Sequence, residues 1–177
     1  MLTIVADSQQ AQEALGASLA RVCPASCVIY LEGDLGAGKT TLTRGFLRAL
    51  GHQGAVRSPT YTLLEPYSLA TRTCYHLDLY RLGDPEELEY LGLRDLLQGP
   101  AVLLVEWPEQ GAGGLPPPDL RIQITYAGAG RRIDLGDASE VGAAMLARFV
   151  DQRRCPSLRS SSESGSGDGR VEEERTP

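Results

Sequence analysis

Apolar residues recur at helical spacing in the first part of the chain. Ala11, Leu15 and Leu19 stand four positions apart within residues 8–20, which places them on one face of a helix. Ser8 or the aspartate before it can cap the first turn. The pattern predicts a helix over 8–20 that packs this face against a core.

Two runs of aliphatic residues have the length and composition of buried strands. They span residues 27–31 and 101–106, and turn residues bound each of them. Such runs are typical of parallel strands that are covered on both faces. A glycine-rich turn follows the first run and leads into a predicted helix over 39–50. That helix ends at Gly51, because glycine tolerates the backbone conformation that terminates helices.

The pattern of residues 61–150 predicts further strands and helices. The expected elements are strands at 61–67 and 73–79, a helix beginning at 84–87, a hairpin of 120–126 with 131–135, and a closing helix over 139–150. Residues 157–177 differ, with six Ser, three Gly, eight charged and only two apolar residues. Such a segment cannot repay its ordering entropy by burial. We therefore expect a single domain over 1–156 and a disordered tail over 157–177.

A glycine-rich loop carries the clearest chemical signal. Residues 33–40 read Gly-Asp-Leu-Gly-Ala-Gly-Lys-Thr and match the phosphate-binding pattern G-x-x-x-x-G-K-[ST]. Glycines let backbone amides converge on an anion, Lys39 adds a compact positive charge, and Thr40 offers a hydroxyl to Mg²⁺. The strand–loop–helix context predicts an α/β fold of the P-loop NTPase type. We expect a three-layer sandwich with a mostly parallel central sheet and a C-terminal antiparallel hairpin.

Composition singles out the same lysine. Of the 17 basic residues, 16 are arginine and only Lys39 is lysine, which marks a position where the planar arginine fork does not serve. The net charge of −6 argues against a chain that grips nucleic acid by itself.

Cysteine usage and hydropathy indicate the compartment. The four cysteines are too few and too irregular for a disulfide scaffold, and no Cys/His pair completes a zinc site with Cys23 and Cys27. No apolar run is longer than five residues, so we expect no membrane span. The first residues lack the basic and apolar order of a secretory signal. These features predict a cytoplasmic protein with reduced thiols.

Three further segments have chemistry that suits a nucleotide site. Glu106 ends the run 101–106, where a carboxylate at the carboxyl end of a parallel strand can hold the metal or its water. In residues 76–81, alternation puts His76 and Asp78 on one strand face, which either meets the nucleotide site or faces water. Residues 58–61, Ser-Pro-Thr-Tyr, form either a switch segment or an ordinary turn.

Together these segments resemble the TsaE (YjeE) family, the small P-loop ATPases of the bacterial machinery that makes threonylcarbamoyladenosine in tRNA. The resemblance covers residues 3–150 and rests on motifs in the family's order and spacing. They are GDLGAGKTT (33–41), SPTYT (58–62), HLDLYRL (76–82), DPEEL (84–88) and VEWPE (105–109).

The resemblance implies residue roles. It implies that Thr40 and Glu106 hold Mg²⁺, that Asp78 lies in the active site, and that Arg131 or the adjacent Arg132 reaches the nucleotide. The residues expected at ATP are Asp34, Gly36, Ala37, Gly38, Lys39, Thr40, Thr41 and Arg131. The resemblance also implies partners related to TsaD and TsaB, which contact the tRNA, while ATP turnover resets or reorganises the assembly.

Hydrolysis in such a site is mostly positioning and electrostatics. Lys39, Glu106 and Asp78 are the catalytic candidates, with Glu106 or Asp78 orienting the water, and we expect slow turnover by the isolated chain. The alternative is a P-loop small-molecule kinase that transfers the γ-phosphate and uses Arg81 or Arg94 on a lid. A GTPase-like module is a weaker reading, because the Asn-Lys-x-Asp guanine signature needs a second lysine.

Overall fold

The computed structural model describes residues 1–84 and 86–154. The proline of the expected helix start at 84–87 and the expected tail over 157–177 lie outside the described residues. Within them the chain forms one seven-stranded sheet in the order β1-β7-β6-β2-β5-β4-β3. The strands are β1 (Leu2–Ala6), β2 (Cys27–Glu32), β3 (Leu64–Ser68), β4 (Thr73–Asp78), β5 (Ala101–Glu106), β6 (Leu120–Ala127) and β7 (Gly130–Asp137).

Parallel pairing is confined to the centre of this sheet. Strands β6, β2, β5 and β4 are neighbours that run parallel. At the edges β3 pairs antiparallel with β4, β7 with β6, and β1 with β7. The parallel sheet that the sequence predicts is therefore the four central strands, and antiparallel strands flank it on both sides.

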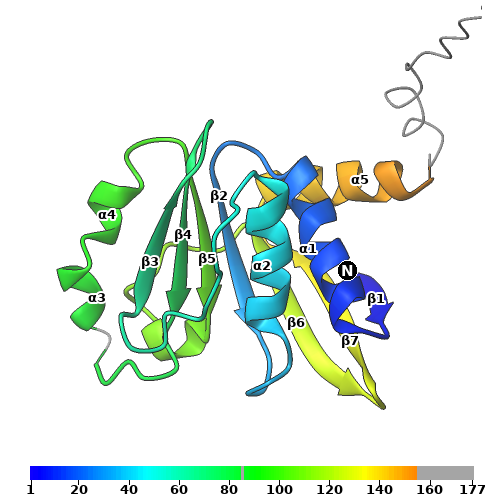
Figure 1. Cartoon of the computed structure of the whole chain (residues 1–177). Helices are drawn as coiled ribbons and strands as arrows, with labels where there is room; N and C mark the ends of the chain where they lie inside the picture. Colours follow the sequence, from blue (N-terminus) through cyan, green and yellow to red (C-terminus); the bar gives the residue numbers. More distant parts are fainter. Residues whose placement is uncertain (85, 155–177) are drawn as a thin grey trace, which may run out of the picture.

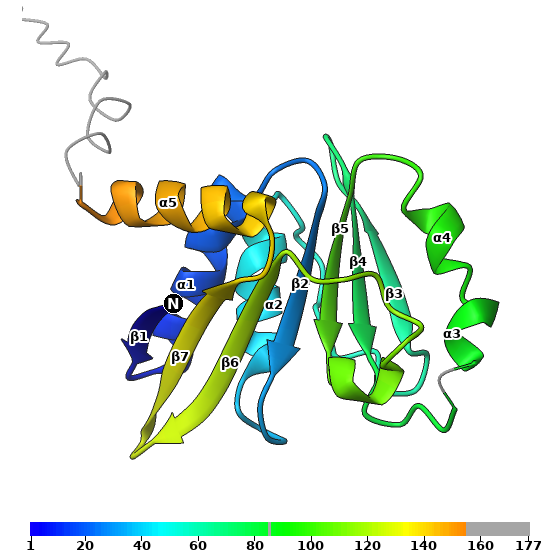
Figure 2. The ribbon, with the colours of Figure 1, turned by 180° about the vertical axis from the view of Figure 1, so that it is seen from behind.

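Helices complete an α/β sandwich around the sheet (Figure 1). They are α1 (Gln9–Val22), α2 (Lys39–Ala49), α3 (Glu87–Tyr90), α4 (Leu93–Leu96), the 3-10 helix η1 (Pro108–Gly111) and α5 (Glu140–Arg154). Helices α1 and α2 cover one face, and α5 packs against α1 and β7. Seen from behind, η1 and the connection that leads to β6 cross the opposite face (Figure 2).

Strand β5 divides the hydrophobic core into two clusters. Val102 and Leu104 belong to the cluster beneath α1, α2 and α5. Leu103 and Val105 belong to the cluster on the other face, with Leu88 of α3. All six residues of β5 are buried, because side chains that alternate between two faces meet a covered surface on each.

Two glycines let α1 and α2 approach closely. A Cβ at Gly16 would lie 2.1 Å from the carbonyl oxygen of Leu42, and one at Gly45 would lie 2.0 Å from that of Glu13. Only residues without a side chain fit this crossing. Since α2 begins directly after the glycine-rich loop, the crossing also fixes the start of α1 beside that loop.

Most predicted elements are confirmed, and three differ. The expected strand over 61–67 begins only at Leu64, because Leu63 adopts a left-handed backbone with φ of 62°. The expected helix at 84–87 becomes two single turns, since Gly92 between them has φ of 63°. Strand β1 was not predicted; it lies at the edge of the sheet and pairs antiparallel with β7.

Candidate functional site

The glycine-rich loop joins β2 to α2 and requires its glycines. Gly33, Gly36 and Gly38 have φ of 138°, 77° and 107°, which side chains disfavour. A Cβ at Gly38 would also lie 2.4 Å from Nε2 of Gln12. No side chain in the described part of the chain caps the N-terminus of α2, and uncapped amides at a helix N-terminus attract anions.

Lys39 is buried at the centre of this loop, with 4% of its surface exposed. Its Nζ donates to the carbonyl oxygens of Gly33 at 2.6 Å and Asp34 at 3.0 Å. It also lies 3.9 Å from the ring centroid of Trp107. Burial lowers the pKa of Lys39, while the nearby carboxylates of Glu106 and Asp78 act in the opposite direction. An anion in the loop would relieve this buried positive charge.

Glu106 connects the loop to the sheet. Thr40 Oγ1, in the first turn of α2, donates to Glu106 Oε1 at 2.8 Å. Nε2 of His76, from the adjacent strand β4, lies 2.8 Å from the same oxygen. Glu106 is 3% exposed and His76 is fully buried. The structure thus brings together three side chains that are far apart in the sequence.

Asp78 lies opposite Glu106 in the parallel pairing of β4 with β5. Its Oδ2 accepts hydrogen bonds from Ser58 and, at 2.8 Å, from Thr60. Its Oδ1 accepts the backbone N–H of Tyr80 at 3.1 Å. The polar face of residues 76–78 is therefore buried toward the loop and does not face water. The turn at 58–60 is hydrogen-bonded to this face through Asp78.

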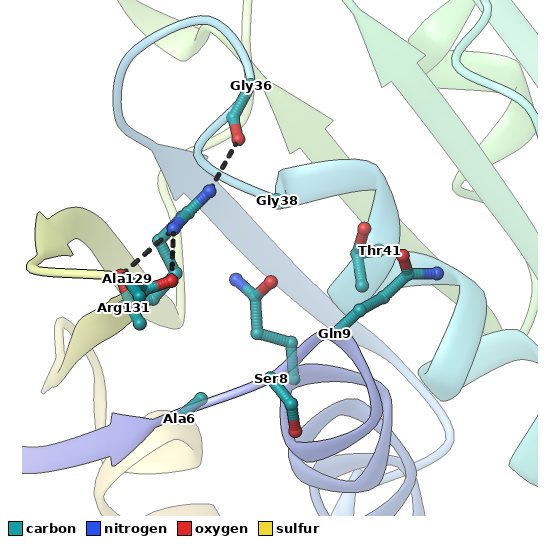
Figure 3. Close-up of a pocket in the computed structure, with 10 residues that line it drawn as sticks. Ala6, Ser8, Gln9, Gly36, Gly38, Thr41, Ala129 and Arg131 are labelled. Carbon is teal, nitrogen blue, oxygen red and sulfur yellow. Dashed lines mark hydrogen bonds between the residues drawn. The ribbon is translucent and has the colours of Figure 1, made fainter.

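These polar side chains surround a cavity of about 250 Å³ in front of the loop. Its lining includes Lys39, Thr40, Ser58, Thr60, Asp78 and Glu106. A second cavity, of about 220 Å³, shares Gly36, Gly38 and Thr41 with the first. As Figure 3 shows, Ser8 and Gln9 at the start of α1 and the β6–β7 turn line its other sides, with Ser8 as the N-cap of that helix. The two cavities therefore lie against the same loop and the first turn of α2.

Arg131 reaches the loop, whereas Arg132 points elsewhere. Arg131 donates from Nε to the carbonyl oxygen of Ala37 at 2.9 Å. It also donates from Nη2 to the carbonyl oxygen of Gly36 at 3.2 Å (Figure 3). Arg132 pairs with Asp134, at 3.0 Å from Nε to Oδ2, on the exposed surface. Successive residues of a strand point to opposite faces, so only one of the pair can meet the loop.

Gln12 is a site residue that sequence reasoning missed. Its Nε2 donates to the carbonyl oxygen of Ala37 at 3.0 Å, and its side chain is 5% exposed. A polar residue beside Leu15 on the apolar stripe of the first helix was the available signal, because glutamine is seldom buried without a specific partner.

The donor atoms suit magnesium better than a metal that needs several protein ligands. Within residues 1–84 and 86–154, no group of three or more His, Cys, Asp or Glu side chains is arranged to hold a metal ion. Mg²⁺ is usually bound through one or two carboxylates together with phosphate oxygens and water. The hydroxyl of Thr40 and the carboxylate of Glu106, 2.8 Å apart at the loop, match that pattern.

None of the helices in the described ranges combines the length and hydropathy that a bilayer-spanning segment requires.

Comparisons with known proteins place the whole site inside one matched region. A family model described as "Threonylcarbamoyl adenosine biosynthesis protein TsaE" matches residues 6–133. The tRNA threonylcarbamoyladenosine biosynthesis protein TsaE of Haemophilus influenzae is 51% identical over 122 residues, which are 69% of this chain and 77% of that protein. Its namesake in Bacillus subtilis is 46% identical over 105 residues, 59% of this chain and 65% of that protein.

A solved structure agrees with the fold. The crystal structure of Bacillus subtilis YdiB superimposes with a TM-score of 0.75 at 30% sequence identity, and the match covers 86% of this chain and 95% of that one. The matched residues 6–133 include every residue that lines the two cavities, from Ala6 to Arg131.

Proposed function

Because this chain belongs to the TsaE family of threonylcarbamoyl adenosine biosynthesis proteins, we propose that it is a Mg²⁺-dependent ATPase. In this proposal it couples ATP binding and hydrolysis to a modifying complex of TsaD-like and TsaB-like subunits. Its role lies in the biosynthesis of threonylcarbamoyladenosine in tRNA. The ATPase activity and the two partners are our inference.

One observation carries the proposal: a buried ammonium group lies beside a hydroxyl–carboxylate pair at an uncapped helix N-terminus. Lys39 Nζ is held by two loop carbonyl oxygens, and Thr40 is hydrogen-bonded to Glu106. A bound triphosphate would neutralise both the positive charge of the ammonium group and the positive N-terminal end of the helix dipole. The glycine conformations keep side chains away from that anion.

The residues of the chain divide the work of hydrolysis. Lys39 neutralises charge on the outer phosphates, and the loop amides fix their position. Thr40 and Glu106 are the ligands for Mg²⁺, which supplies charge neutralisation at the phosphate oxygens when bound. Glu106 and Asp78 both line the cavity, and either carboxylate can orient the attacking water.

In this proposal the nucleoside part of ATP binds in the second cavity. Its lining includes Thr41 of α2, residues at the start of α1 and the β6–β7 turn, and does not include Glu106. Arg131 spans its wall and stacks on Tyr126, 4.2 Å from the ring centroid. The guanidinium group of Arg131 adds positive charge near the phosphates while it stays hydrogen-bonded to the loop.

The charge of the whole chain supports a division of labour with partners. A net charge of −6 disfavours direct binding to tRNA, so contact with the tRNA falls to the other subunits. An ATPase of this kind works as a switch, and we expect slow turnover until the partners complete its site.

The test combines labelled ATP with reconstitution. We expect the purified chain to release free phosphate slowly, in a Mg²⁺-dependent reaction that accelerates with TsaD-like and TsaB-like subunits, and to be required for tRNA modification by them. Transfer of label to a small molecule would indicate a kinase instead. If the full set modified tRNA equally well without this chain or without ATP hydrolysis, the proposal would be wrong.

A further inference from the structure

His76 stands out because a polar ring occupies a fully buried position on a parallel strand of the sheet. It lies in β4 opposite Leu104 of β5, with none of its surface exposed. Its Nδ1 has no hydrogen-bond partner within the described part of the chain. A buried polar atom without a partner opposes folding. Packing alone therefore does not account for a histidine here, where an aliphatic side chain would fit the surrounding core.

The one polar contact that the ring makes within residues 1–84 and 86–154 identifies what it does. Nε2 lies 2.8 Å from Glu106 Oε1. A proton on Nε2 makes this contact a hydrogen bond, whereas a lone pair on Nε2 would face the lone pairs of the carboxylate. The favoured neutral form carries its proton on Nε2 and leaves Nδ1 as the unprotonated atom. The ring is thus a donor fixed toward one carboxylate oxygen.

Two donors converge on that oxygen. Thr40 Oγ1 and His76 Nε2 both contact Oε1 of Glu106, from α2 on one side and β4 on the other. Neither of these contacts uses Oε2. Two fixed donors on one oxygen set the plane of the carboxylate, so the other oxygen keeps one direction at the cavity that Glu106 lines.

We propose that His76 is a positioning residue that holds the carboxylate of Glu106 in the orientation needed to bind Mg²⁺ with the nucleotide. The inference rests on the proposed ATP and Mg²⁺ site. A fully buried ring cannot touch a ligand in the cavity, so His76 acts only through Glu106. Donors behind a ligating carboxylate commonly change metal affinity by about 10–100-fold when they are removed.

A pair of polar substitutions separates positioning from packing. In His76→Gln the side-chain amide can replace Nε2 as the donor to Glu106. In His76→Asn the amide is too short to reach that oxygen, although the residue stays polar. A third variant, Thr43→Val, serves as a packing control. It removes a different buried polar atom, a hydroxyl that has no partner in the described residues. Melting temperatures show that each variant is folded before its binding is measured.

The readout is ADP affinity with and without Mg²⁺, followed through the fluorescence of Trp107, the one tryptophan in the chain. We expect Mg²⁺ to tighten ADP binding equally in the unsubstituted chain, His76→Gln and Thr43→Val. In His76→Asn this Mg²⁺-dependent gain should fall by about ten-fold or more, while the affinity for ADP alone stays unchanged.

The outcomes distinguish this inference from the proposed function. If Mg²⁺ fails to tighten ADP binding in the unsubstituted chain, the proposed metal–nucleotide site itself is wrong. If the unsubstituted chain responds to Mg²⁺ and His76→Asn responds equally, the site stands and the role of His76 is overturned. An equal loss in Gln and Asn variants would also overturn it, because restoring the donor would then have no effect.

Discussion

At Lys39, burial and charge act against each other. The ammonium group is almost completely enclosed, and carbonyl oxygens and the Trp107 ring are its nearest contacts. Burial lowers its pKa, so the folded chain binds this proton less tightly than the unfolded chain does. The charge that serves phosphate binding therefore destabilises the nucleotide-free fold.

Replacing Lys39 by Met should separate stability from function. At pH 7 and without nucleotide, we expect Lys39→Met to unfold at the same temperature as the unsubstituted chain or a higher one. The difference should shrink as pH rises through the lowered pKa toward the ordinary value of about 10.4. ATP hydrolysis should fall by about 100-fold or more. Thermal unfolding at several pH values and a phosphate-release assay measure these effects; a lower melting temperature at pH 7 would contradict the account.

The neighbouring arginines 131 and 132 provide a matched comparison. Arg131→Ala removes a charged donor from the carbonyl oxygens of Gly36 and Ala37, and we expect ATP affinity to fall by about ten-fold. Arg132→Ala breaks only an exposed pair with Asp134, so affinity should stay within about two-fold. Calorimetric titration with MgATP measures both, and equal effects would mean that Arg131 has no special place at the loop.

At the scale of elements, the crossing of α1 and α2 controls the loop. The two helices touch through Gly16 and Gly45, and α1 carries Gln12, which donates to the carbonyl oxygen of Ala37. A wider crossing would draw Gln12 away from the loop. The contact between the helices is therefore part of the geometry of the site as well as of the core.

A methyl group at the crossing should reverse the usual effect of glycine replacement in a helix. Alanine normally stabilises a helix interior by about 1 kcal/mol relative to glycine. In Gly16→Ala the added carbon meets the carbonyl oxygen of Leu42, so we expect a loss of about 1–3 kcal/mol together with weaker ATP binding. Gly136→Ala is the control, since no atom of the described residues beyond its chain neighbours lies within 4 Å of its added carbon. Denaturant unfolding decides, and equal stability of the two variants would refute the close crossing.

At the scale of the whole molecule, the site is assembled around one end of the parallel strands. Glu106 and Asp78 stand at the ends of β5 and β4, and the loop follows the end of β2. The carboxyl ends of parallel strands meet at one edge of the sheet, which is where α/β proteins bind ligands. Every residue of this arrangement lies before position 140.

Removing residues 157–177 tests the expected domain boundary. A chain that ends at Pro156 keeps every described element and both cavities. We expect its melting temperature and its rate of ATP hydrolysis to match those of the full chain, because the removed segment has only two apolar residues to bury. Parallel unfolding and phosphate-release measurements make the comparison. A large change in either would show that the tail contributes to the fold or the site.

The amino-acid sequence by itself determined the elements whose signals are local. Strands β2 and β5 follow from continuous aliphatic runs, and α2 follows from the glycine-rich loop and Gly51. The loop is also specified locally, because Gly33, Gly36 and Gly38 have positive φ angles that other residues seldom adopt. For these parts, nearby residues contain the physical cause.

Only the tertiary structure decided which polar side chains meet. The pairing of Asp78 with Glu106 depends on the register of β4 against β5, and the approach of Arg131 depends on the pairing of β7 with β6, which itself pairs with β2. A shift of one residue would turn Arg132 to the loop instead. Gln12 and His76 are buried because elements distant in the sequence pack over them. The pattern within one segment cannot fix such contacts, since register and helix crossing are set by all the packed surfaces together.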